Sequence, residues 1–153
     1  MKRKVLVLGL GNPLWGDEGA GIAVIKELKH KDLPEGVDLK AEGTPGLKLL
    51  DLLKGYDEVI VVDAADMGLE PGEWRSFELD EVHLLSGEGA RFAHQFGLAE
   101  VLELSEALGI KMPRVKIYGI QPQYLGFGEE LSPPATRAVQ EVKETLAKEL
   151  ASV

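Results

Sequence analysis

The stretch that decides the fold is an apolar run that passes directly into a glycine-rich loop: Lys4-Val5-Leu6-Val7-Leu8-Gly9-Leu10-Gly11-Asn12-Pro13-Leu14-Trp15-Gly16-Asp17-Glu18-Gly19-Ala20-Gly21. Its first half predicts a buried β-strand, and its second half places Asp17 and Glu18 at the start of a helix. A glycine-rich loop at a helix N-terminus normally holds a phosphate through backbone N–H groups and the positive end of the helix dipole. Two carboxylates would repel a phosphate there, and they would suit a metal ion instead.

Length and composition set the class of protein. The 153 residues predict a single domain, residues 1–153, with a sizeable core. Without a long apolar run or an export signal, we expect no membrane insertion and a cytoplasmic location. The chain has no cysteine, which excludes disulfides, thiolate catalysis and cysteine-ligated zinc. A net charge of −9 disfavours nucleic acid as a partner and favours cations, including metal ions.

Strand-like and helical patterns alternate along the rest of the chain. Strands are expected at residues 37–41, 57–63, 73–79 and 115–120, and helices after Gly21, Thr44, Gln95 and Ser132. The run 57–63 is the most apolar, as is typical of a central parallel strand. The charged run 73–79 follows a turn too short for a crossover, which indicates an antiparallel or marginal strand. The predicted fold is α/β, a three-layer sandwich with a mainly parallel, twisted sheet of about five strands and helices on both faces.

The candidate site lies at the carboxyl edge of this sheet. In such folds, ligands bind where the connections after neighbouring strands diverge to opposite faces. If the first and third strands are neighbours, Asp17 and Glu18 meet Asp63, which follows four apolar strand residues. Acids in a first helical turn also stabilise the helix by up to about 1 kcal/mol, so the pair alone defines no site. His94, at a loop-to-helix junction, either caps a helix or completes a mixed oxygen and nitrogen set for a divalent transition metal.

Three other site classes fit less well. A dinucleotide-binding loop requires a third glycine, which residues 9–14 lack. In a receiver domain the acid pair follows the first strand more closely and a lysine follows the last strand, whereas here Gln121 and Pro122 follow it. A serine hydrolase would require Gly-x-Ser-x-Gly, which does not occur. Of the other histidines, His30 is expected on the surface, and His83 has no polar partner nearby in the sequence.

The acid loop and several later segments resemble the hydrogenase maturation endopeptidases, which trim a C-terminal extension from the large subunit of nickel–iron hydrogenases. The matching segments are residues 9–21, 42–46, 61–64 and 119–122 and the region of His94, so the resemblance covers nearly the whole chain. Residues 62–72 and 119–127 look most similar to the subgroup that serves the hydrogenase of formate hydrogenlyase and related membrane-bound complexes. The second acid is Glu18, where many members carry Asp.

The resemblance implies a metal-assisted mechanism. The metal-contacting residues would be Glu18, Asp63 and His94, and the nickel would arrive already bound by cysteines of the substrate, with no organic cofactor. The general base would be Asp17 or Asp63, unless Asp17 has only a capping or indirect role. The residues expected to present backbone to an extended substrate peptide are Gly43, Thr44 and Gly46.

The partner implied by the resemblance is the hydrogenase large-subunit precursor, and we expect the chain to act on it as a monomer. The leading hypothesis is therefore a processing endopeptidase. The alternative is a non-catalytic metal- or peptide-binding chaperone of hydrogenase maturation, which would use the same site without hydrolysis.

Overall fold

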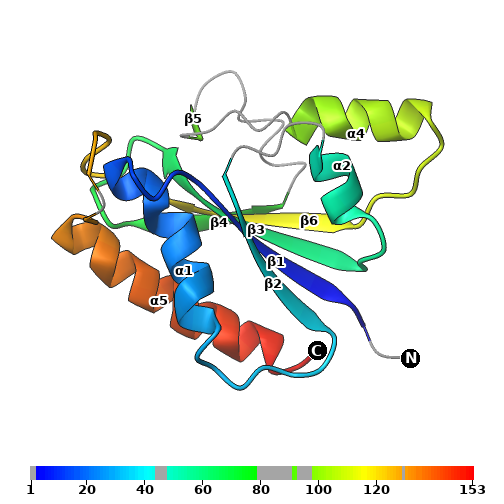
Figure 1. Cartoon of the computed structure of the whole chain (residues 1–153), viewed down its shortest axis with the longest axis horizontal. Helices are drawn as coiled ribbons and strands as arrows, with labels where there is room; N and C mark the ends of the chain where they lie inside the picture. The colour runs from blue at the N-terminus through cyan, green and yellow to red at the C-terminus, as the bar shows by residue number, and fades with distance from the viewer. Residues whose placement is uncertain (1–2, 44–47, 79–90, 93–97, 129) are drawn as a thin grey trace.

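The computed structural model describes residues 3–43, 48–78, 91–92, 98–128 and 130–153 (Figure 1). The helices are α1 (Ala20–Leu28), α2 (Lys48–Leu53), α4 (Leu98–Ala107) and α5 (Pro133–Leu150), and a 3-10 turn, η1 (Gly16–Gly19), precedes α1. The strands are β1 (Val5–Leu10), β2 (Val37–Glu42), β3 (Glu58–Asp66), β4 (Trp74–Glu78), β5 (Arg91–Phe92) and β6 (Arg114–Ile120). This order confirms the predicted alternation of strands and helices.

The sheet is mainly parallel, as predicted. Its strands follow the order β2-β1-β3-β6-β4, and the two-residue β5 pairs with the end of β3. The pairs β1–β2, β1–β3 and β3–β6 are parallel, with Leu6 opposite Val59 and Val61 opposite Ile117. The charged strand β4 lies at the sheet margin and pairs antiparallel with β6, since the short connection after β3 cannot make a crossover.

Helices cover both faces of the sheet. Figure 1 shows α1 and α5 on one face and α2 and α4 on the other. Because side chains alternate along a strand, each strand supplies both cores. The core under α1 and α5 contains Val5, Val7, Ile60, Val62, Tyr118 and Ile120 among others. The core under α2 and α4 contains Leu6, Leu8, Leu10, Val59, Val61 and Ile117 among others.

The expected helix starts are confirmed where the structure describes them. Ser132 caps α5, because its Oγ accepts a hydrogen bond from Ala135 N at 3.3 Å and Pro133 takes the first helical position. In α1 the predicted face of Gly21, Val24, Ile25 and Leu28 is buried. The predicted cap at Thr44 and the start of a helix at Gln95 lie outside the described residues. None of the helices in the described ranges has the length and apolarity that a membrane-spanning helix requires.

Tyr118 joins β6 to α5 at the edge of the first core. Its hydroxyl donates a hydrogen bond to Glu149 Oε1 at 2.8 Å, and Lys116 Nζ lies 2.8 Å from the same oxygen. Burial, together with the bond to Glu149, raises the pKa of Tyr118 to about 12. The ring therefore stays neutral at physiological pH, which suits its place in the apolar layer.

The first turn of α1 contacts the sheet backbone directly. A Cβ atom at Gly21 would overlap the carbonyl oxygen of Val62 and lie 2.6 Å from that of Leu10. Only glycine lets the helix approach β1 and β3 this closely. This contact sets where the acid loop sits over the sheet.

We expect Gly21→Ala to lower the free energy of unfolding by about 1–3 kcal/mol, because the added methyl group forces α1 away from two backbone carbonyls. Chemical denaturation measures the change. Gly43→Ala is the matched control, because its nearest contact is 3.9 Å away, and it should shift stability by less than about 0.5 kcal/mol. Equal stability of the two variants would contradict the close approach of α1.

Candidate active site at the carboxyl edge of the sheet

The loop after β1 folds back over the ends of β1 and β3. Strand β1 pairs directly with β3, which confirms that the two strands are neighbours. A Cβ atom at Gly11 would overlap the carbonyl oxygen of Glu18 and would lie 3.9 Å from Asp63 Oδ1. Gly11 has φ +142°, a conformation that other residues rarely adopt. The backbone of Glu18 and the side chain of Asp63 therefore both lie next to Gly11, although the two acids are far apart in the sequence.

Asp63 is a buried carboxylate and the sixth of the nine residues of β3. It shares its strand face with Val59 and Val61, the face that α2 and α4 cover. Its Oδ1 accepts a hydrogen bond from Ala64 N at 2.8 Å, and its side chain is fully buried. Burying an ionised carboxylate is unfavourable unless it is well bonded or binds a cation, so this position favours a functional role.

Glu18 is half-buried in η1, immediately before α1. The turn that carries it is 3-10 rather than the first α-helical turn expected from the sequence, and Glu18 N donates to Trp15 O at 3.2 Å. The turn directly precedes the N-terminus of α1, where the helix dipole favours an acid.

Asp17, the neighbour of Glu18, is fully buried and holds a different segment of the chain. Its Oδ2 accepts hydrogen bonds from Gln123 N at 2.8 Å, Tyr124 N at 3.0 Å and Ser132 Oγ at 2.7 Å. Its Oδ1 accepts from Ser132 N at 2.8 Å. Asp17 N in turn donates to Tyr124 O at 2.8 Å. One carboxylate therefore joins the acid loop to the segment before α5.

These bonds favour one of the two roles considered for Asp17. A carboxylate that already accepts four hydrogen bonds has little lone-pair capacity left to take a proton from water. The capping and positioning role therefore fits Asp17 better than the role of general base. Of the two candidates, the geometry favours Asp63 as the base.

Gln121 is a site-forming residue whose role the sequence did not reveal. It is buried directly after β6, and its Oε1 accepts from Met67 N at 2.7 Å and Leu69 N at 3.3 Å. Its Nε2 donates to Asp66 Oδ1 at 3.3 Å. Gln121 thus fixes the turn that follows β3. The available signal was a polar residue at the end of a buried strand, as for Asp63.

The expected peptide-binding loop begins at the same edge. Gly43 is exposed at the end of β2, and a Cβ atom there would lie 3.9 Å from Gly11 O. The other two residues expected to bind substrate, Thr44 and Gly46, lie outside the described residues. Of the three residues, only Gly43 is described, and it lies next to the acid loop.

The third expected metal ligand, His94, also lies outside the described residues, as does His83. Within the described ranges, no three His, Cys, Asp or Glu side chains form a cluster that could hold a metal ion. Of the three expected metal ligands, the structure thus describes only Glu18 and Asp63. His30 is exposed just beyond the end of α1, at the opposite edge of the sheet, as expected.

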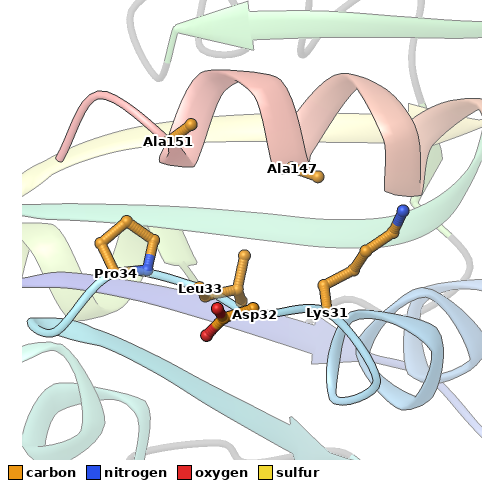
Figure 2. A pocket seen from close by; sticks show the side chains of 6 residues that line it. All are labelled: Lys31, Asp32, Leu33, Pro34, Ala147 and Ala151. Carbon is orange, nitrogen blue, oxygen red and sulfur yellow. The ribbon is translucent and has the colours of Figure 1, made fainter.

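A surface hollow between α1 and α5 is remote from this edge. Figure 2 shows it between the turn after α1 and the last part of α5, lined by Lys31, Asp32, Leu33, Pro34, Ala147 and Ala151. Both segments lie at the amino edge of the sheet, because α1 and α5 run antiparallel to β1. Its only charged lining residues are Lys31 and Asp32, and none of the predicted site residues lines it.

Comparisons with known proteins agree with the family suggested by the motifs. A family model described as hydrogenase maturation protease, HycI, matches residues 22–149. The hydrogenase expression/formation protein HupD of Rhizobium leguminosarum bv. viciae is 38% identical over 152 residues, which covers 97% of this chain and 75% of HupD.

Two solved structures share the fold over almost their whole length. The hydrogenase maturating endopeptidase HybD from E. coli has a TM-score of 0.84 at 28% identity, covering 97% of this chain and 93% of HybD. The [NiFe] hydrogenase maturation protease HybD from Thermococcus kodakarensis has a TM-score of 0.81 at 29% identity, covering 96% and 99%.

We expect Asp17→Asn to destabilise the fold by about 2–3 kcal/mol, because the new amide N–H groups would face backbone donors that the carboxylate now satisfies. Thermal and chemical unfolding measure the change. Asp66→Asn is the matched control, because Asp66 is exposed and the substitution keeps its Oδ1 acceptor, so little stability should be lost. If Asp17→Asn unfolds like the unmodified protein but has lost activity, Asp17 acts in the chemistry instead.

Proposed function

This chain belongs to the hydrogenase maturation protease family, and we propose that it removes the C-terminal extension of a nickel–iron hydrogenase large-subunit precursor after nickel insertion. It is an endopeptidase, as the family is. The observation that supports the finer proposal is that the backbone of Glu18 and the carboxylate of Asp63 both lie against Gly11. The motif similarity of residues 62–72 and 119–127 favours a precursor of the formate hydrogenlyase type, processed in the cytoplasm by the monomeric chain.

Nickel belongs to the substrate in this proposal. The protein supplies oxygen donors from Glu18 and Asp63 and an imidazole from His94, and it has no cysteine with which to hold a soft or borderline metal tightly by itself. Such a donor set fits a cation that is already bound by thiolates of the precursor. A precursor without nickel would lack the ion that joins the two proteins, which explains why cleavage would follow metal insertion.

The chemistry proposed for the site is hydrolysis of one peptide bond. A divalent cation beside the scissile bond polarises its carbonyl oxygen or lowers the pKa of a bound water. Asp63 would accept the proton of the attacking water, and Asp17 would keep the acid loop in place through its four hydrogen bonds. Asp63 is buried in the free protein, so docking of the precursor has to open a path to its carboxylate.

Substrate peptide would approach along the loop that begins at Gly43. This residue is exposed and lies next to Gly11, so a peptide held against Gly43 would run beside the acid loop. Backbone groups of Gly43, Thr44 and Gly46 would bind an extended segment in this arrangement.

We expect Glu18→Gln, Asp63→Asn and His94→Ala each to lower the rate of trimming by at least about 100-fold, because each removes a metal contact or the base. The measurement is the conversion of nickel-loaded precursor with time, followed by intact mass, with circular dichroism as the check on folding. The matched controls are Asp32→Asn and His30→Ala at the opposite edge of the sheet, which should trim normally. Normal trimming by His94→Ala would move the third ligand to another residue.

We expect the chain to shorten the nickel-loaded precursor and to leave the nickel-free precursor intact, because only the loaded form carries the bridging ion. A gel and intact-mass measurement of both reactions detect the loss of the C-terminal segment. A chelator added to the loaded precursor, whose nickel resists extraction, should have no effect. Immediate loss of activity with chelator would indicate a metal resident in the protease, and binding without any mass loss would favour the non-catalytic chaperone.

A further inference from the structure

Large apolar side chains gather on one exposed surface beside the acid loop. Seven large hydrophobic residues of the described part of the chain are exposed. Five of them lie in two loops: the first loop connects β1 to η1, and the second loop connects β6 to α5. We call these five the apolar patch: Leu14, Trp15, Tyr124, Leu125 and Phe127. Phe127 is 78% exposed and Trp15 is 41% exposed. The other two, Leu104 and Leu108, lie in α4 and just after it.

The two loops form one continuous surface. Gly16 N donates to Gly128 O at 2.8 Å, Gly128 N donates to Leu14 O at 2.8 Å, and Trp15 and Gly128 form a parallel β-bridge. Within the second loop, Tyr124 Oη donates to Phe127 O at 3.2 Å. In Figure 1 the loop before α5 lies beside the start of α1. The patch is therefore a single feature built from both loops.

The buried carboxylate of Asp17 holds the patch in shape. This carboxylate accepts hydrogen bonds from Gln123 N and Tyr124 N in the second loop. Asp17 itself lies just after the first loop in the sequence. The exposed rings are thus carried by backbone that these hydrogen bonds fix in place. A surface ordered before binding loses less conformational entropy on association, which favours its use as a binding surface.

Exposed aromatic residues of this kind indicate a protein partner. Contiguous apolar surface is rare on proteins that act alone, and Trp, Tyr and Phe are enriched at the centres of protein interfaces. Three of its five members are aromatic and two are leucine. Its partner surface should accordingly be apolar.

The patch is also continuous with the candidate active site. Trp15 lies three residues before Glu18, and Asp17 connects both to the second loop. A protease that acts on one bond of a folded precursor has to hold that precursor outside the cleaved segment. We propose that the apolar patch docks an apolar surface of the hydrogenase large-subunit precursor next to its C-terminal extension. This inference rests on the proposed function, and it adds the surface that selects the partner.

The test compares Phe127→Ser with Leu108→Ser in trimming of the nickel-loaded precursor. Both changes remove one large exposed side chain, at 78% and 60% exposure, and neither should alter the melting temperature. Phe127→Ser should raise KM by about 10- to 30-fold with kcat within about twofold, as for an interface anchor. Leu108→Ser should leave both constants unchanged. Equal constants for the two variants would overturn the docking role.

A binding measurement separates this proposal from the proposed function. With Asp63→Asn in the background to block cleavage, Phe127→Ser should weaken binding of the precursor by a similar factor and Leu108→Ser should not. If the unmodified chain binds the precursor without trimming it, the proposed function fails while this comparison still decides the docking role. A dimer of the chain in solution that Phe127→Ser dissociates, with precursor binding unchanged, would assign the patch to self-association and overturn the proposal.

Discussion

The arrangement of the acid loop depends on the hydrogen bonds to the Asp17 carboxylate. This group is fully buried, and three backbone N–H groups and the Ser132 hydroxyl donate to it. A buried charge is tolerated only when its hydrogen-bonding capacity is used, and here it is used by a segment more than a hundred residues away in the chain. Because Ser132 also caps α5, the same residue joins the start of α1 to the start of α5.

The two adjacent acids, Asp17 and Glu18, therefore have different surroundings. Asp17 points into the protein and determines where two loops lie, whereas Glu18 remains half-buried beside Gly11 and Asp63. The close approach of α1 to the backbone of β1 and β3 at Gly21 brings this pair over the carboxyl edge of the sheet. The acids are adjacent in sequence, but one carboxylate is fully buried and accepts four hydrogen bonds, whereas the other residue is only half-buried.

The same hydrogen bonds connect the acid site to the apolar patch. The loop that carries Tyr124, Leu125 and Phe127 is held by Asp17 at its beginning and by backbone bonds to residues 14 and 16 near its end. The proposed metal site and the proposed docking surface are thus held by the same hydrogen bonds. In the proposed function, this arrangement would couple docking of the precursor to placement of the bond that is cleaved.

The sequence by itself determined the α/β class, the central position of β3 and the cap of α5, because strand periodicity, helical periodicity and a Ser–Pro helix start depend on local chain chemistry. It also singled out the acid pair and Asp63 as candidate site residues. It also indicated the family through the motif around Gly11 and Glu18. The sequence could not distinguish the role of Asp17 from that of Glu18, since both are acids at one helix start. Nor could it assign a role to Gln121 or join Trp15 to Phe127. Those points depend on contacts between distant segments, and only the tertiary structure determines which donors reach a given carboxylate and which side chains remain exposed.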